Sequence, residues 1–368
     1  MMPVQRREGR RAVWIICLFW VFAACDETPY EAPQDQHEVA PDVAPDLSPP
    51  DAMAEADVEG DTDAANDLPP EEVADLPPEE VADVPPADVV DVPPEEVVDA
   101  VEDTGPEWAE GPYPVRVMAA NISSGNYQSY DPGHGIRIFQ GLDPDVVLIQ
   151  EFNYANNTTS DIRRFVDTAF GPGFYYVRGR GQIPNGVVSR YPILESGYWP
   201  SNEVSNRDWD WAVLDLPGGK DLLAVSVHLH TDRNAREMPV LRDRIAAKNL
   251  NNRYYLVLGG DFNTDSRTAA RTHFNAIVEA NGPYPVDNRG VEGTNASRTK
   301  PYDWVLACAA FESYEVSVAI GANAFPEGLV FDSRVYTPLI DVSPVLVGDS
   351  GAPQMQHMAV VRDFHFRL

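Results

Sequence analysis

Side chains that can bind metal ions or transfer protons follow several apolar runs in the C-terminal part of the chain. They are carboxylates, imidazoles and amides, found at Asn121, Glu151, His228, His230, Asp261, Asn263, Asp303 and His357. Singly, each has an ordinary structural explanation, since an Asp that follows two glycines commonly forms a turn with its own backbone. Together they offer oxygen ligands for Mg²⁺, Mn²⁺ or Ca²⁺, and imidazoles for proton transfer or for stabilising an anion. The sequence has neither a His-x₃-His nor a Cys-x₂-Cys spacing, so it does not favour a zinc site.

The elements that precede these side chains must bring them together. Short apolar runs predict strands, several of them buried on both faces, at 115–120, 146–150, 186–189, 212–216, 222–229, 254–258 and 303–306. Helical patterns lie between some of them, at 160–169, 238–250 and 266–280. Alternation along 225–230 places Ser226, His228 and His230 on one face. The pattern predicts an α/β domain whose chemistry lies where strands end.

Six motifs occur in an order that is also found in a known group of enzymes. They are 146–151, 186–193 (Gly-Val-Val-Ser-Arg-Tyr-Pro-Ile), 225–229, 259–263 (Gly-Gly-Asp-Phe-Asn), 302–306 and 357–361. This set resembles the endonuclease/exonuclease/phosphatase superfamily, which includes DNase I-like nucleases, apurinic endonucleases, sphingomyelinases and inositol polyphosphate phosphatases. The resemblance spans 115–368 and implies a DNase I-like sandwich of two packed β-sheets flanked by helices. It further implies that 111–368 is a catalytic domain that hydrolyses phosphodiester or phosphomonoester bonds with a divalent metal.

The resemblance assigns the catalytic roles. Asp261 resembles the group that activates the attacking water, and Asn263 helps to position that water. His228 and His357 resemble the two histidines that flank the scissile phosphate. Asp303 resembles the carboxylate that hydrogen-bonds His357 and keeps it charged. Such charged groups neutralise the charge that develops on the phosphoryl oxygens.

The resemblance also assigns the metal ligands, and here the chain departs from the family pattern. Glu151 resembles the principal Mg²⁺ ligand, with Asn121 nearby contacting the metal or the phosphate. Where the family usually has an Asp before its final histidine, this chain has Gln356, and Ser123 stands where some nucleases carry an acidic ligand. Asp349, in a nearby loop, is a substitute ligand to consider. Fewer carboxylates predict weaker metal binding or a single metal, so the alternative function is a catalytically impaired family member that acts as a binding module.

The substrate is left open by the sequence. Residues 111–368 carry 23 basic and 28 acidic side chains, which is not the composition of a nucleic-acid-binding surface. A local basic patch for nucleic acid could form from Arg178, Arg180 and Arg190. An apolar face for a lipid substrate could form from Trp199, Trp209 and Trp211. In both cases an ordinary structural role, on the surface or in the core, is the competing explanation.

One motif predicts no activity. The segment 348–353 (Gly-Asp-Ser-Gly-Ala-Pro) resembles the nucleophile loop of trypsin-like proteases. Only 18 residues follow Ser350, however, and the surroundings of His228 in the sequence do not match those proteases. We therefore expect 348–353 to be a surface loop.

The first 25 residues predict export. Four arginines precede an apolar run at 12–24 that is shorter than the roughly 20 residues needed to span a bilayer. Phe22-Ala23-Ala24-Cys25 resembles a bacterial lipobox, which predicts a lipid on Cys25 and attachment of the exported protein to a membrane of the cell envelope. A cleaved signal with an incidental Cys is the alternative. We expect a monomer whose catalytic domain lies outside the cytoplasm.

Residues 26–110 hold 29 of the 58 acidic side chains and no Lys or Arg. A Pro-Pro pair recurs every eight residues from Leu68, which excludes a continuous helix. Dense like charge and few aromatic residues predict a disordered acidic Pro-rich spacer, with a reach of about 250 Å at roughly 3.1 Å per residue.

The third cysteine, Cys308, is left without a disulfide partner if Cys17 is removed with the signal and Cys25 carries the lipid. Its apolar surroundings in the sequence predict a buried, inert thiol.

Overall fold

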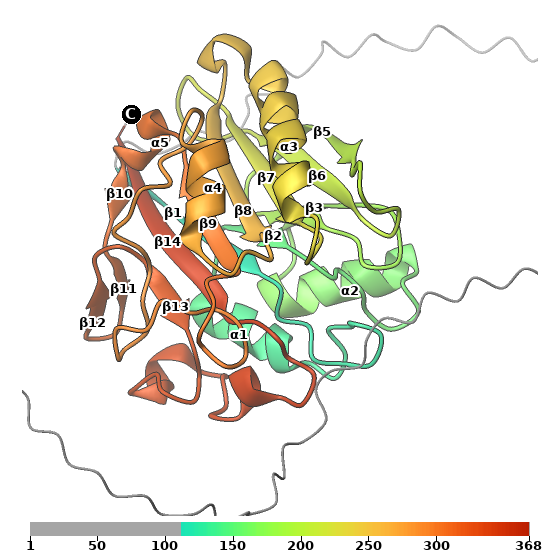
Figure 1. Ribbon diagram of the computed structural model, residues 1–368. Helices are drawn as coiled ribbons and strands as arrows, with labels where there is room; N and C mark the ends of the chain where they lie inside the picture. Colours follow the sequence, from blue (N-terminus) through green and yellow to red (C-terminus); the bar gives the residue numbers. More distant parts are fainter. Residues whose placement is uncertain (1–111, 368) are drawn as a thin grey trace, which may run out of the picture. The chain divides into compact units, whose positions relative to one another are not determined.

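The computed structural model describes residues 112–367 (Figure 1). The predicted signal at 1–25, the lipidation site Cys25 and the spacer at 26–110 lie outside the described residues, so those predictions are not tested by it. Within 112–367, no helix is long and apolar enough to cross a membrane.

A mixed sheet of seven strands forms one layer of the domain. Its order is β10-β14-β1-β2-β4-β3, with β13 also paired to β14. The strands are β1 (Pro112–Ala120), β2 (Val146–Ile149), β3 (Tyr175–Arg178), β4 (Gly186–Ser189), β10 (Glu315–Val316), β13 (Leu329–Phe331) and β14 (Ala359–Arg367). The β1 strand pairs in parallel with β2 and antiparallel with β14, so the last strand of the chain lies beside the first.

A second sheet of five strands runs in the order β5-β6-β7-β8-β9. Its strands are β5 (Ile193–Pro200), β6 (Asp208–Leu214), β7 (Leu222–His228), β8 (Tyr255–Asp261) and β9 (Asp303–Ala307). Only β7 and β8 pair in parallel, and α3 connects them. A separate hairpin joins β11 (Val318–Ile320) to β12 (Asn323–Phe325).

The helices cover the outer faces of the two sheets (Figure 1). They are α1 (His134–Leu142), α2 (Thr159–Phe170), α3 (Asn234–Lys248) and α4 (Arg267–Phe274), whereas the single turn α5 (Ala309–Glu312) packs Phe311 into the cluster between the sheets. The start of α2 is fixed by a capping box, in which Thr158 and Asp161 each bond the other's backbone N–H.

Three hydrophobic clusters correspond to the interfaces between these layers. The middle cluster lies between the sheets, where Val117 and Leu148 of the first sheet face Ala224 and Val257 of the second. The other two clusters pack α1 and α2 on the first sheet, and α3 and α4 on the second. The predicted α/β sandwich of two packed sheets flanked by helices is confirmed. Full burial of β2, β4 and β7 explains why these strands appear as nearly continuous apolar runs. The β6 strand is buried too, but it was predicted only from residue 212 because Asp208 and Asp210 interrupt its apolar pattern.

Several predicted boundaries were wrong. The helix predicted from 238 begins at Asn234, because Glu237 anchors the first turn by accepting hydrogen bonds from Ser201 and from the His230 N–H. The helix predicted to end at 280 ends at Phe274, because the Glu279 N–H bonds the carbonyl of Ala307 and so follows the edge of β9. Cys308, predicted to be buried, is half-buried.

Candidate active site

Strand pairing in the second sheet aligns three of the predicted catalytic residues. The β7–β8 register places His228 opposite Asp261, and the β8–β9 register places Asp261 opposite Asp303. The three residues therefore stand side by side at one edge of the sheet. Asp261 is the last residue of β8, and it also has the turn-forming role expected of an Asp after two glycines, because its Oδ1 accepts from the Asn263 N–H at 2.8 Å.

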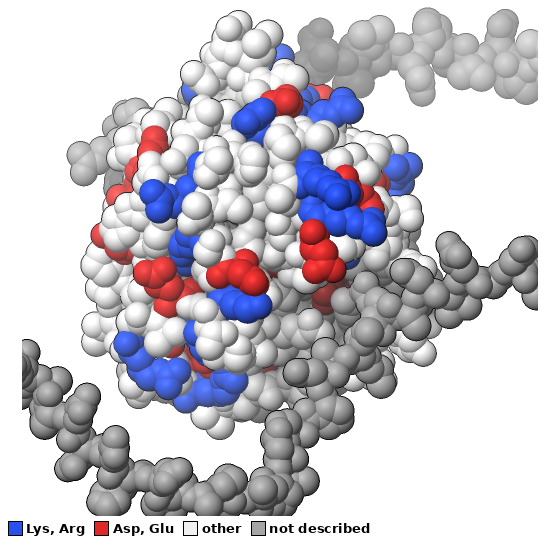
Figure 2. Space-filling view, viewed as in Figure 1, with Lys and Arg blue, Asp and Glu red and all other residues white. Residues whose placement is uncertain are grey.

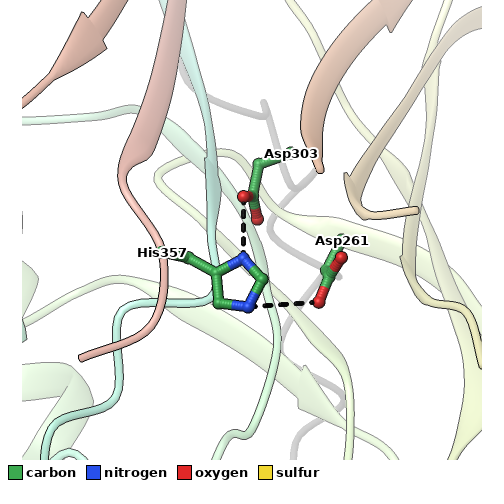
Figure 3. A group of neighbouring side chains, drawn as sticks. All are labelled: Asp261, Asp303 and His357. Atoms are coloured by element: carbon green, nitrogen blue, oxygen red, sulfur yellow. Dashed lines mark hydrogen bonds and ion pairs between the residues drawn. The ribbon is translucent and has the colours of Figure 1, made fainter. Parts of the chain in front are cut away.

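His357 reaches this edge from the first sheet, just before β14. Its Nδ1 lies 2.9 Å from Asp303 Oδ2, and its Nε2 lies 3.4 Å from Asp261 Oδ2 (Figure 3). On the other side, His228 Nε2 lies 3.3 Å from the same Asp261 oxygen. The structure thus brings together His228, Asp261, Asp303 and His357, as the sequence predicted.

The two imidazoles have opposite electrostatic environments. Burial alone would lower the pKa of His357, but the charges of Asp303 and Asp261 raise it to about 10. Burial and the nearby cations Arg207 and His357 hold the pKa of His228 well below 6.5. At neutral pH His357 is a cation and His228 is neutral.

The Asp261 carboxylate, between the two imidazoles, has a pKa close to neutral pH. Burial raises the pKa of Asp261 to about 7, although the His357 charge opposes this and the Asp303 charge adds to it. Asn263 orients this carboxylate, because its backbone N–H bonds Asp261 Oδ1 at 2.8 Å and its side-chain amide contacts Oδ2 at 3.2 Å. A group with a pKa near the working pH is suited to general-base catalysis.

Glu151 and Asn121 lie beside this group, at the ends of β2 and β1. The Asn121 amide donates to Asp261 Oδ2 at 3.1 Å, and its Oδ1 is buried with no hydrogen-bond partner. Glu151 accepts hydrogen bonds from the Ser123 hydroxyl and from Gln128 Nε2, the latter at 3.0 Å. Burial raises the pKa of Glu151.

These residues fit a hard divalent cation. Its charge would stabilise the buried Glu151 carboxylate, and Asn121 Oδ1 is an acceptor without a donor. Asp261, Asp303 and His357 also have ligand atoms within 4.8 Å of one another. We do not assign His357 as a ligand, because both its nitrogens face carboxylates and a charged imidazole has no lone pair for a metal.

The backbone is strained at four positions around this site. Tyr127, Gln128, Glu151 and Asn263 all have left-handed φ, between 48° and 57°. Such conformations cost about 1–3 kcal/mol each for non-glycine residues, and they tend to persist where function requires them.

Three residues that the sequence analysis did not identify support the site. Arg207 Nε donates to the His228 carbonyl at 2.8 Å. Thr294 Oγ1 accepts from the Asp303 N–H at 2.8 Å, and the Thr294 carbonyl accepts from the Met358 N–H at 2.6 Å. Gln128 is the third of these residues, and it supports the site by donating a hydrogen bond to Glu151. None precedes or follows an apolar run in a way that marks it, so only the folded chain identifies it.

The remaining predicted candidates lie outside this constellation. Gln356 is exposed, which favours a position outside the metal's immediate ligands. Asp349 is not available as a substitute ligand, because it forms an ion pair with Arg137. His230 is half-buried, and its Nδ1 accepts from the Asp232 N–H, as expected for a residue without a direct role.

The prediction that 348–353 forms a surface loop was only partly right, since Gly348, Gly351 and Pro353 are exposed but the middle of the segment is not. Asp349 and Ser350 are buried in a short 3-10 helix. The Ser350 hydroxyl accepts from the Ser333 N–H, and the Ser350 N–H donates to the Ser333 hydroxyl, both at 2.9 Å. These residues fasten the segment that leads to His357, and they form no protease site.

The residues considered for substrate surfaces have structural roles. Arg180 and Arg190 form ion pairs with Asp208 and Asp145, and Arg178 bonds the carbonyl of Phe152 at 2.6 Å. On the face shown in Figure 2, basic and acidic side chains are interspersed. The three tryptophans pack in the cluster under α3, with Trp209 fully buried.

A polar cavity of about 390 Å³ adjoins the constellation. Asn263 and Tyr302 form the side nearest to Asp261 and His357, and the Tyr302 ring centroid lies 5.8 Å from that of His357. Lys300, Asp265 and Asp232 line the rest. The cavity offers room for part of a polar ligand next to the candidate catalytic groups.

Comparison with known proteins identifies relatives of this chain. Residues 118–324 match the model of the Endonuclease/Exonuclease/phosphatase family. No curated protein was found to be significantly similar in sequence. Among solved structures, an endonuclease/exonuclease/phosphatase from Beutenbergia cavernae DSM 12333 is 17% identical, with 69% of this chain and 72% of that chain covered and a TM-score of 0.47. A family protein from Leptotrichia buccalis C-1013-b is 14% identical (68% and 100% covered, TM-score 0.47). Sphingomyelinase C from Streptomyces griseocarneus is 15% identical (68% and 99% covered, TM-score 0.44).

Proposed function

The chain belongs to the endonuclease/exonuclease/phosphatase family, and we propose that it is a divalent-metal-dependent hydrolase of phosphodiester or phosphomonoester bonds. The observation that carries this proposal is the position of Asp261. Its carboxylate lies between a charged imidazole, His357, and a neutral one, His228. A base flanked in this way can act on a water while the cation faces a phosphoryl oxygen.

In the proposed mechanism, Asp261 takes a proton from the water whose oxygen bonds to phosphorus, while the P–O bond to the alcohol breaks and the departing oxygen takes a proton from solvent. Asn263 keeps the Asp261 carboxylate oriented. The positive charge of the His357 imidazolium stabilises a phosphoryl oxygen, and Asp303 preserves that charge and the orientation of the ring. Neutral His228 contributes a hydrogen-bonding group on the opposite side. Each contact becomes stronger as negative charge accumulates on the phosphoryl group, which is the condition for lowering the barrier.

Glu151 and Asn121 would hold the divalent metal, for which Mg²⁺ is our first choice and Mn²⁺ or Ca²⁺ are alternatives. When bound, the metal supplies Lewis-acid stabilisation of the phosphoryl oxygens. Gln128 and Ser123 keep the Glu151 carboxylate in one orientation by donating hydrogen bonds to its two oxygens.

A substrate panel tests this function. Purified protein is incubated with nucleic acids, phospholipids and small phosphomonoesters, with Mg²⁺, with Mn²⁺ and with EDTA. We expect release of product from at least one class, and loss of that activity in EDTA. Failure across every class would favour the alternative of a catalytically impaired binding module, whereas turnover in full EDTA would contradict the metal.

We also propose that the protein is exported and attached to a membrane through Cys25, with 26–110 as a spacer. The support is the sequence alone, namely the lipobox-like Phe22-Ala23-Ala24-Cys25 and the acidic proline repeat. Cys25→Ser should move the protein from the membrane fraction to a soluble exported fraction, or leave its signal uncleaved. Deleting 68–100 should leave specific activity unchanged, and a large loss would show that the repeat has a further role.

A further inference from the structure

The most exposed large apolar or aromatic side chain in the described part of the chain lies next to the candidate active site. Tyr127 is 94% exposed, at the tip of the turn between β1 and α1. The following residue, Gln128, donates from Nε2 to Glu151 Oε1 at 3.0 Å. Tyr127 is therefore the chain neighbour of a residue whose side chain contacts the proposed metal ligand.

The backbone of this turn is held in place on several sides. The N–H groups of Ser124 and Gly125 both bond the Ser129 carbonyl, at 3.1 and 2.8 Å. Asn126 Oδ1 accepts from Gln354 Nε2 at 2.8 Å, on the segment that leads to His357. An exposed ring on a fixed backbone is presented at little further cost in chain entropy when a ligand binds.

The turn is strained without a packing benefit from Tyr127. Tyr127 and Gln128 are consecutive non-glycine residues with φ of 57° and 55°. This geometry directs Gln128 inward to Glu151 and leaves the Tyr127 ring in solvent. A bulky residue in this region is uncommon, and a ring that packs on nothing does not stabilise the fold in return.

We propose that Tyr127 is a stacking surface for the substrate, and that the substrate is a phosphoester that carries a nucleobase. The proposal rests on the proposed function, because the phosphate must lie at Asp261 and His357. An aromatic ring stacks on a base whatever the base is, since every base has a flat π face. The amides of Asn126, Gln128 and Gln354 each use one polar atom within the protein, and the other, Asn126 Nδ2, Gln128 Oε1 or Gln354 Oε1, can hydrogen-bond the edge of such a base.

The surroundings favour a single nucleotide unit over a long polyanion or a membrane. The stretch 121–131 has neither Lys nor Arg, whereas binding to a nucleic-acid backbone depends on such cations. Beside Tyr127 the exposed residues of the turn are polar, so one ring would have to insert into a bilayer alone. Membrane-inserting surfaces combine several apolar side chains.

Binding by the full chain tests the proposal separately from hydrolysis. The dissociation constants of AMP and of ribose 5-phosphate are measured by calorimetry with Mg²⁺, on an Asp261→Asn background that prevents turnover. With Tyr127 present, AMP should bind about tenfold more tightly than ribose 5-phosphate, which is the order of the contribution of one stacked base. Tyr127→Ala should remove the difference and Tyr127→Phe should keep it. Tyr175→Ala, which removes another exposed tyrosine (46%), on β3, is the matched control and should also keep it.

The outcomes separate the two ideas. If the preference for AMP depends on Tyr127 but the wild type hydrolyses no phosphoester, the result would support stacking and contradict the proposed hydrolase function. A wild type that hydrolyses phosphoesters, with equal AMP and ribose 5-phosphate binding before and after Tyr127→Ala, would overturn stacking and leave the hydrolase intact. Loss of binding to phosphatidylcholine vesicles in Tyr127→Ala, with no effect on AMP, would assign the ring to a lipid surface and also overturn the proposal.

Discussion

The two sides of the candidate site hold the same residue type in opposite charge states. His357 and His228 are buried to a similar extent, at 6% and 5% exposure, and both have Nε2 near Asp261 Oδ2. On the β9–β14 side, Asp303 bonds the second nitrogen of His357, and the pKa rises to about 10. On the β6–β7 side, Arg207 lies close to His228, whose Nδ1 is buried without a hydrogen-bond partner, and the pKa falls.

The difference shows that the charged groups next to each histidine, and not its burial, determine its charge state. Desolvation lowers the pKa of both imidazoles, so a nearby anion or cation decides the outcome. One sheet edge can therefore supply a cation for the phosphoryl group and a neutral imidazole beside the same carboxylate. Substitutions that remove or exchange these partners should reveal which side contributes more to catalysis.

The largest effect should come from the residues that act on the reacting atoms. His357→Ala and Asp261→Asn should each lower kcat by roughly 10²–10⁴-fold, the usual range for loss of a general acid–base group. KM should change less, because the lost contacts strengthen in the transition state. Steady-state kinetics checks this, with circular dichroism as a control for folding. Wild-type rates in both variants would contradict the assignment of the active site to Asp261 and His357.

The next effect should appear as a change in pH dependence. Asp303→Asn removes the main source of the raised pKa of His357, so the pKa should fall from about 10 towards its usual 6.5. The active form is the imidazolium, which is lost as pH rises through this pKa. The variant should therefore lose activity at lower pH than wild type, with a rate at pH 9 at least about tenfold below it.

Asp265→Asn is the control for this experiment. Asp265 is an exposed carboxylate that pairs with Lys300 near the same cavity and does not bond His357. Its loss should leave the basic limit of activity where it is. If Asp303→Asn and Asp265→Asn have the same pH profile as wild type, the charged state of His357 does not depend on Asp303.

A smaller effect is expected from Thr294. Thr294→Val removes the hydroxyl that accepts the Asp303 N–H, and an unsatisfied buried N–H costs about 1–3 kcal/mol. Asp303 should then be less well fixed, with kcat lowered by roughly tenfold at most. Thr294→Ser keeps the hydroxyl and should restore kcat and the basic pH limit. If Ser does not restore them, Thr294 contributes only packing.

The candidate site residues could be located in the sequence because each stands next to the start or the end of a strand. His228 is the last residue of β7, Asp261 the last of β8, and Asp303 the first of β9. A short apolar run followed by one polar residue is visible in the sequence. The supporting residues have no such mark, since Thr294 and Arg207 lie in loops and act through single hydrogen bonds.

The fold was predictable where local pattern and packing agree. Buried strands such as β2 and β4 were found as continuous apolar runs. The β5 strand was missed because it is mostly exposed and has little apolar pattern. The helix α1 is amphipathic, but it was missed because its ends carry no local signal: Gly133 makes no side-chain capping bond, and the last turn has no basic residue. The end of α4 was misplaced, because it depends on a hydrogen bond to β9 rather than on local sequence.

The smallest effect should come from Gln356. The family pattern has an Asp here, and a carboxylate among the metal's ligands would tighten Mg²⁺ binding by about tenfold, near 1.4 kcal/mol. Because the Gln356 side chain is exposed, we now expect little change in Mg²⁺ affinity. Mg²⁺ titration by calorimetry compares the two proteins, and tenfold tightening would place residue 356 within reach of the metal.

The most direct test of the central claim is Mg²⁺ add-back to EDTA-stripped protein, followed by release of product from the best substrate of the panel. Wild type and Glu151→Gln are measured side by side, with Glu195→Gln, which alters an exposed carboxylate on β5, as control. We predict that wild type and the control recover hydrolysis with Mg²⁺, while Glu151→Gln needs at least about tenfold more Mg²⁺ or stays inactive. Hydrolysis by the stripped wild type, or identical Mg²⁺ dependence in Glu151→Gln, would contradict a metal-dependent site at Glu151.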